Sequence, residues 1–201
     1  MTISQYLLGL KTNDIIDDDI METIFPAKVI FNFNGMNNWA YNNTNNKKYS
    51  FTYICWVEKN ISFTFLRNGY DLVSTNFKGC RMAKYINHQN QLCGCHIHCI
   101  DRGHTDDRRN LWNQYVTGNN INIQNSILFQ PDVTMRTMIE NRFPRLDMDL
   151  WGIIAQDGSC YSVIIYTAAD YIATRYRKDL KAPVHLHSII KHPKEPTMII
   201  N

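Results

Sequence analysis

A cysteine and two histidines near the middle of the chain stand at a spacing that suits nucleophilic catalysis. Segments 81–86 and 91–100 are rich in β-branched, aromatic and alternating residues, and we predict that they form two strands joined by a polar turn. Folding one strand back on the other places Cys80 opposite the stretch that holds His96 and His98. Opposed residues point to the same face with Cβ atoms about 4.5–5.5 Å apart. We therefore expect an imidazole within reach of the thiol.

A Cys–His pair supplies the two groups that amide hydrolysis needs. The thiolate is the nucleophile, and an adjacent imidazolium lowers the thiol pKa from about 8.5 and later donates a proton to the leaving amine. Gly79 leaves the backbone open to close approach by a substrate, and nearby N–H groups could hold an oxyanion. A third group usually orients the histidine. Asp101, Thr75 and a backbone carbonyl are the alternatives that the sequence leaves open.

Strand alternation decides which of these side chains share a face. His96 and His98 point to one side of their strand. Cys95, Ile97 and Cys99 point to the other side. A one-residue slip of the register would take both histidines away from the nucleophile together. The catalytic hypothesis therefore depends on the register of this strand pair.

The same segment resembles the Ser-Gly-Cys … His arrangement of glutamine deamidases. The likeness rests on Phe-Lys-Gly-Cys80, a strand, a short turn and a second strand that carries His96, and it covers residues 74–101. These families include the necrotising-factor-type bacterial toxins and the chemotaxis-receptor deamidases. The resemblance implies a β-sandwich in which Cys80 attacks, and His96 acts as base and then acid, on a Gln side chain of a partner protein. This chain has Lys78 where the toxins carry Ser, and His96 fits the family histidine better by position than His98.

Two His-x-His pairs raise the alternative of a metal site. One pair is His96 and His98, and the other is His185 and His187. If the two pairs converged, they could bind zinc through ring nitrogens about 2.0–2.1 Å from the metal. The two cysteines just before the first pair would face away from it, which weakens a mixed Cys/His site. The ordinary alternative for the second pair is an edge strand near the C-terminus.

A nuclease is another alternative for the same region. His98, followed by Asp101 and Asn110-Leu-Trp, is similar to the His…Asn-Leu pattern of HNH nucleases. In that family a histidine activates water, and an asparagine with a neighbouring acid holds a divalent metal that stabilises the leaving phosphate. The position just before the histidine, where that family has a metal-binding Asp or Asn, is Ile97.

A purely structural role for these residues is the remaining alternative. Free cysteine is among the most buried residue types, so Cys80 would be a small core residue in this interpretation. His96 and His98 would be satisfied polar residues on a half-exposed strand. The protein would then be a non-catalytic binding protein.

Composition excludes several classes of protein. Of the 201 residues 44% are hydrophobic and 19% are charged, which excludes a disordered chain. No apolar run reaches the ~18–20 residues of a membrane span, and the first ten residues lack the features of a cleavable signal peptide. The net charge of +3 is too small to predict a surface for nucleic acid. Six cysteines are too few for a disulfide scaffold, so we expect reduced thiols.

These features together predict where the protein acts and with what. We expect a cytoplasmic protein, or one exported without a cleavable signal peptide. The expected partner is a protein with a reactive Gln, with no cofactor, no nucleic acid and no membrane. The target protein and the oligomeric state are left open.

The elements that position the site are mostly short. Residues 2–25 predict one or two short helices that end before Pro26. Apolar runs between turn residues predict further strands at 29–33, 49–58, 61–67 and 70–75.

Later segments complete the predicted fold. Asp157-Gly predicts a tight turn that joins 150–155 to 160–166 as a hairpin. Thr167-x-x-Asp predicts the start of a helix of about ten residues. The polar, Asn-rich residues 101–125 predict a long surface loop. We predict one α+β domain over residues 1–201, with a mainly antiparallel β-sheet or β-sandwich and a few short helices.

Overall fold

The computed structural model of the chain is built around two β-sheets. The residues that it describes are 1–24, 29–31, 39–42, 44–58, 60–77, 79–98, 105–118, 121, 126–131, 146–168 and 183–193. The helices in this part of the chain are α1 (Ile3–Leu8), α2 (Asp18–Ile24) and α3 (Thr105–Gly118). None of these helices is long and apolar enough to cross a membrane, and the described residues hold no other candidate.

Each sheet has six strands. Sheet I contains, in spatial order, β12 (His185–His192), β11 (Cys160–Ala168), β10 (Leu146–Ile154), β6 (Asp71–Ser74), β4 (Phe51–Ile54) and β3 (Thr44–Asn45). Sheet II contains, in spatial order, β1 (Val29–Phe31), β2 (Trp39–Asn42), β5 (Ile61–Phe65), β8 (Leu92–Ile97), β7 (Arg81–Ile86) and β9 (Ile127–Phe129). Among the described strands only β2 with β5 and β4 with β6 pair in parallel, so the mainly antiparallel α+β fold is confirmed.

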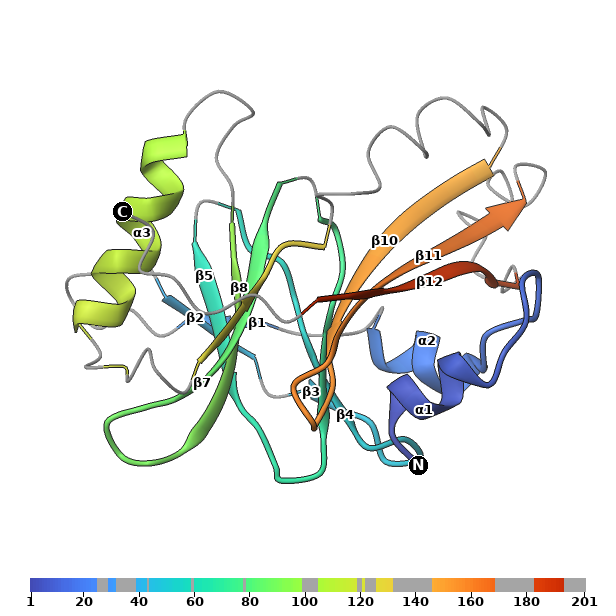
Figure 1. Ribbon diagram of the computed structural model, residues 1–201, viewed down its shortest axis with the longest axis horizontal. Coiled ribbons are helices and arrows are strands. Elements are labelled where there is room, and N and C mark those ends of the chain that lie inside the picture. Colours follow the sequence, from blue (N-terminus) through green and yellow to red (C-terminus); the bar gives the residue numbers. More distant parts are fainter. Residues whose placement is uncertain are drawn as a thin grey trace.

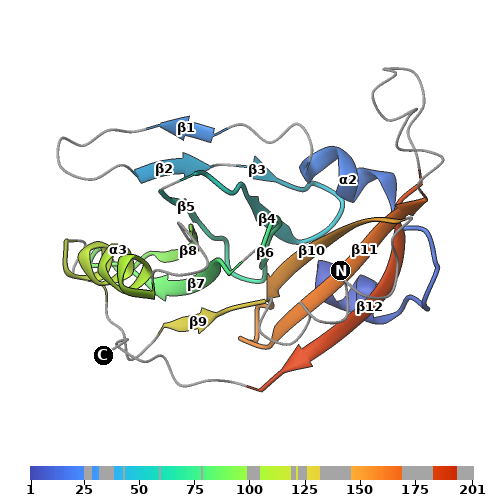
Figure 2. The same ribbon diagram turned by 90° about the horizontal axis from the view of Figure 1, so that it is seen from above.

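The sheets and helices stack as four layers (Figures 1 and 2). Helices α1 and α2 cover the outer face of sheet I, where they share one apolar cluster with its side chains. The two sheets face each other across a second cluster. Helix α3 covers the outer face of sheet II through a third cluster. A residue on either sheet therefore points either to the helices or to the layer between the sheets.

Strand β10 illustrates how the sequence produces these layers. Leu150 and Ile154 belong to the cluster between the sheets. Trp151 and Ile153 alternate with them and belong to the cluster under α1 and α2. Both faces of the strand are buried, so its apolar residues run almost without interruption. Gly152 stands between the two inward residues, where an added Cβ would clash with Met82 of the opposite sheet.

Two polar contacts also join the two sheets. The Nζ of Lys84 on β7 donates to the carbonyl oxygens of Ala155 and Gln156, both at 3.1 Å, in the turn after β10. The second contact joins Ser74 on β6 to His96 on β8. Both contacts lie among buried apolar residues, where an unpaired polar group would be costly.

The expectation of a polar loop over residues 101–125 is wrong for its central part. Residues Thr105–Gly118 form α3. Trp112, Tyr115 and Val116 stand at helical spacing, and all three are buried against the outer face of sheet II. The many polar residues masked this narrow stripe in the sequence, although three such positions suffice to hold one helix face against a sheet.

Several other expectations are confirmed. The short helices before Pro26 are α1 and α2. The hairpin around Asp157-Gly158 is formed by β10 and β11, and Gly158 has the positive φ of 82° that this turn requires. The predicted helix start at Thr167 is wrong, because β11 continues through Thr167 to Ala168. The rest of that predicted helix lies outside the described residues.

Candidate active site

The register of β7 and β8 is one of those predicted from the sequence. Met82 pairs with His96, and Arg81 pairs with Ile97. One step beyond the last pair, the same register places Cys80 opposite His98. His96 is then the diagonal neighbour of Cys80, at a distance of about 7–8 Å between Cα atoms that long side chains can bridge.

The side chains of Cys80 and His96 both belong to the layer between the two sheets. Cys80 is 3% exposed and lies in the cluster that also contains Met82 and Phe77. His96 is 1% exposed, and its ring stacks on the ring of Phe77 with centroids 4.6 Å apart and planes at 13°. The opposite side chains of β8, Cys95 and Ile97, point to α3. The predicted division of the strand into two faces is therefore confirmed for these residues.

Hydrogen bonds hold His96 in one tautomer. The Oγ of Ser74 lies 2.6 Å from the Nδ1 of His96 and 2.6 Å from the carbonyl oxygen of Ile54. A carbonyl only accepts, so the single hydroxyl proton of Ser74 goes to Ile54. The hydroxyl oxygen then accepts a hydrogen bond from the Nδ1–H of His96. The lone pair of the imidazole is therefore on Nε2.

The Nε2 of His96 is buried and has no hydrogen-bond partner among the described residues. The Cys80 thiol is thus not hydrogen-bonded to this nitrogen in the structure. Burial, and to a smaller extent the neighbouring His98, lower the pKa of His96 to about 3. The imidazole is consequently neutral at physiological pH, with an accepting nitrogen held in a dry environment.

Ser74 is the orienting residue that the sequence did not identify. The expected alternative Thr75 turns to the other side, where its Oγ1 lies 2.8 Å from the hydroxyl of Tyr53. Asp101, another expected alternative, lies outside the described residues, as do Lys78 and Cys99. The signal for Ser74 was strand alternation, because Leu72 and Ser74 share the inward face of β6.

His98 lies at the more open end of the site. Its ring packs against Trp56, with centroids 5.2 Å apart and planes at 50°, and its backbone N–H donates to the carbonyl oxygen of Asn60 at 3.1 Å. Trp56 is 37% exposed, which is high for so large an apolar side chain. The partly exposed Trp56 ring therefore covers one side of the buried His98 side chain.

The alternative metal site is not assembled in this structure. His96 and His98 lie on sheet II, whereas His185 and His187 lie on β12 at the edge of sheet I. His185 stacks on Tyr166 and His187 packs near the same ring. Within the described residues, no three His, Cys, Asp or Glu side chains come together as a metal site would require.

The structure of this region also differs from the one that the nuclease alternative predicted. Asn110 and Trp112 lie on α3 and not in the predicted loop, and Trp112 is buried against sheet II. Asp101 lies outside the described residues. His98 faces Trp56 between the sheets, whereas α3 packs on the outer face of sheet II.

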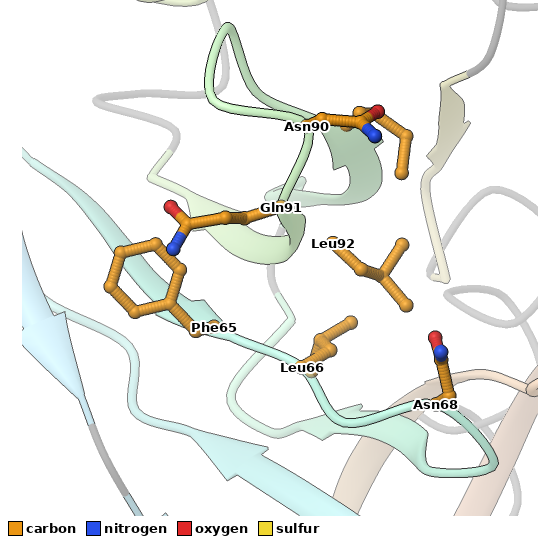
Figure 3. Close-up of a pocket in the computed structure, with 7 residues that line it drawn as sticks. Phe65, Leu66, Asn68, Asn90, Gln91 and Leu92 are labelled. Atoms are coloured by element: carbon orange, nitrogen blue, oxygen red, sulfur yellow. The ribbon is translucent and has the colours of Figure 1, made fainter.

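A pocket of about 520 Å³ lies at the other end of β8 from His96 (Figure 3). Its floor is apolar, and the amide side chains of Asn68, Asn90 and Gln91 stand around Leu66 and Leu92. None of the residues that line it has a nucleophilic or titratable side chain. The pocket therefore lacks the groups for acid–base or nucleophilic chemistry.

No protein family, curated protein or solved structure matches this chain in comparisons of sequence and fold. The likeness to glutamine deamidases accordingly rests on residues 74–101 and stays a prediction.

Proposed function

We propose that the protein is a cysteine hydrolase that acts on amides, and that it deamidates a Gln side chain of a partner protein. Cys80 is the nucleophile and His96 is the base. The reaction takes Gln and water to Glu and ammonia. The short motif that resembles glutamine deamidases supports the same substrate.

One observation carries the proposal. His96 is a buried histidine whose Nδ1 is held by Ser74 and whose Nε2 has no partner among the described residues. A histidine that only fills a core would be expected to have both ring nitrogens satisfied. A base needs an oriented ring with one accepting nitrogen, and Ser74 provides this orientation from the opposite sheet. The Cys80 thiol lies on the same inward face.

Entry of the Gln amide beside the imidazole replaces part of the apolar surroundings that lower the His96 pKa, so this pKa rises, and the Cys80 thiol then transfers its proton to the Nε2 of His96. The sulfur attacks the amide carbon, and backbone N–H groups near Gly79 hold the oxyanion. The Nε2–H then donates its proton to the amide nitrogen, so that ammonia leaves and a thioester forms. Water, activated by the same Nε2, attacks the thioester. Collapse of this second intermediate releases Glu and returns the proton to the thiol.

The reaction requires the thiol and Nε2 to approach each other when substrate binds. Hydrogen bonds of catalytic pairs are often long without substrate and tighten in the complex. We place the approach of the substrate at Trp56, because this ring is the half-exposed cover over His98 and His98 lies opposite Cys80. Displacement of Trp56 would admit a Gln side chain without disturbing the contact between Ser74 and His96.

Release of ammonia tests the proposal directly. The purified full chain is incubated with carbobenzoxy-Gln-Gly and with unfolded casein, and ammonia and the conversion of Gln to Glu are followed. We expect Cys80→Ser to abolish release and Cys160→Ser to retain it. Cys160 is the matched control, because it is a buried cysteine of the same inter-sheet cluster. Release that survives in Cys80→Ser, or its absence with both substrates in the wild type, would contradict the proposal.

A further inference from the structure

Gly152 forms a socket on the inward face of sheet I. It pairs with Ser74 on one side and with Ser162 on the other. A Cβ at this position would lie 2.5 Å from the Cγ of Pro131, 2.6 Å from the Sδ of Met82 and 2.9 Å from the Cε2 of Phe77. Real Cβ atoms do not approach other atoms so closely, so these side chains occupy space that only glycine leaves open.

The backbone before Cys80 turns so that Phe77 fills this socket. Asn76 and Gly79 both have positive φ, at 63° and 93°, on either side of Phe77. Asn and Gly are the residues that adopt this conformation most readily. The Phe77 ring is 4% exposed and lies flat on the imidazole of His96.

We propose that Phe77, seated in the Gly152 socket, is a positioning residue that fixes the ring of His96 and keeps water from one of its faces. Ser74 holds the imidazole by one nitrogen, which still permits the ring to tilt about that contact. A flat aromatic ring on its face removes this freedom. The lone pair of Nε2, which lies in the ring plane, then keeps the direction from which the Cys80 thiol must approach it. This inference rests on the proposed function for its catalytic meaning, whereas its structural content concerns His96 alone.

The pKa of His96 measures how well the Phe77 ring shields the imidazole from water. The neighbours on β5, β6 and β7 are Ser62, Ser74 and Met82, which carry no charge. The titratable groups of the described residues in this layer are His98 on the same strand, Cys80 and Lys84 on the side of β7, and Cys160 on sheet I. None of these groups is altered by substitution of Phe77. Water admitted at the ring face would stabilise the imidazolium and raise the pKa of His96.

Nuclear magnetic resonance of the labelled histidines tests the inference without reference to catalysis. His96 is assigned from a His96→Gln spectrum, and its titration and tautomer are followed in the full chain. We expect His96 to titrate at least one pH unit higher in Phe77→Ala than in the wild type. Phe77→Leu keeps apolar volume in the socket, so it should fold even where Phe77→Ala does not. In Phe77→Leu the pKa of His96 should rise as well, but by less than in Phe77→Ala.

Gly152→Ala provides a second route to the same displacement. The added methyl would displace the Phe77 ring together with Pro131 and Met82, so His96 should again titrate higher. If Gly152 acts through Phe77, then adding Gly152→Ala to Phe77→Leu should change the pKa of His96 little beyond the rise already caused by Phe77→Leu alone. Independent, additive changes would contradict the socket.

The outcomes separate this inference from the proposed function. An unchanged pKa and tautomer of His96 in both Phe77 variants would overturn the positioning role, whatever the enzyme does. Under the inference, the acid limb of ammonia release moves up in pH with the His96 titration in each variant. If the wild type releases no ammonia but the His96 titration shifts in the variants, the proposed hydrolase function is refuted. The positioning of His96 by Phe77 would still be supported.

Discussion

Ser74 is the residue on which the orientation of His96 depends. Its hydroxyl donates to Ile54 and accepts from Nδ1, so that one side chain selects the tautomer with a basic Nε2. Replacement by alanine would leave the Nδ1–H without this acceptor and the ring free to rotate. The neighbouring Thr75 offers a matched control, because its hydroxyl contacts Tyr53 and not the histidine.

We expect Ser74→Ala to lower the rate of amide hydrolysis by roughly 100-fold, the size of a typical general-base contribution. Thr75→Ala should leave the rate within a few-fold of the wild type, at a stability cost of about 1 kcal/mol for the lost hydrogen bond. Steady-state ammonia release with both variants measures this difference. Equal rates in the two variants would show that Ser74 does not orient a base.

Burial of His96 also predicts a pH dependence of stability. Its pKa is about 3 in the folded chain, against about 6.5 in an unfolded chain. Between these values the unfolded state binds a proton that the folded state does not, so the free energy of unfolding falls as pH falls. Between pH 6.5 and pH 4.5 the free energy of unfolding of the wild type should fall by roughly 2 kcal/mol more than that of His96→Gln. Urea unfolding at both values tests this, and equal losses would mean that His96 is not buried as described.

The sequence predicted the thiol and the histidine but not their orienting partner. Cys80, His96 and His98 follow from register arithmetic on two consecutive strands joined by a short turn. Ser74 lies on the other sheet, and its contact with His96 depends on how the two sheets pack. Contacts between sheets are not encoded in the spacing of one strand pair, so this part of the site required the structure.

At the scale of elements, α3 shows where composition misled the prediction. The polar residues around Trp112 favoured a loop, whereas three apolar residues at helical spacing hold a helix on sheet II. The aromatic ring of Trp112 packs near those of Tyr85 and Tyr115, whose hydroxyls are hydrogen-bonded to each other. The strands were more predictable, since β7 begins and ends at the residues expected for it.

Substitutions on α3 distinguish the helix from a loop. Trp112→Ala should lower the free energy of unfolding by about 3–5 kcal/mol, because it leaves a cavity under the helix. Gln114→Ala on the exposed side should change it by less than about 0.5 kcal/mol. Denaturant unfolding curves of both variants give the comparison. Similar small effects would indicate that α3 does not pack on sheet II.

At the scale of the whole molecule, the candidate site lies inside a sandwich whose outer faces are covered by helices (Figure 1). Sheet I supplies Ser74 and the Gly152 socket, and sheet II supplies His96. The sandwich class followed from many short strands separated by turns. The partition of twelve described strands into two sheets, with two parallel pairings, did not follow from sequence neighbours.

The covered site predicts that Trp56 controls access to Cys80. Trp56→Ala should raise the rate at which iodoacetamide modifies Cys80, because it opens the side of the sandwich next to His98. Phe65→Ala is the control, since Phe65 is also an exposed aromatic residue but lines the pocket at the other end of β8. Mass spectrometry of the peptides identifies the modified thiol. A rate that rises equally in both variants would speak against access at Trp56.

The most direct test of the Cys80–His96 pair is the reactivity of Cys80 in the folded wild type and in His96→Ala. The chain is treated with iodoacetamide from pH 4 to 10, and each cysteine is followed by mass spectrometry. Cys93 and Cys95 serve as internal controls, because burial raises the pKa of both thiols. Iodoacetamide carries the same primary amide as a Gln side chain, so it should bring the thiol and Nε2 together as substrate does. We predict that Cys80 reacts first at neutral pH and at least tenfold more slowly without the His96 base. A Cys80 that reacts only in the unfolded chain, or at the same rate in His96→Ala, would contradict the account.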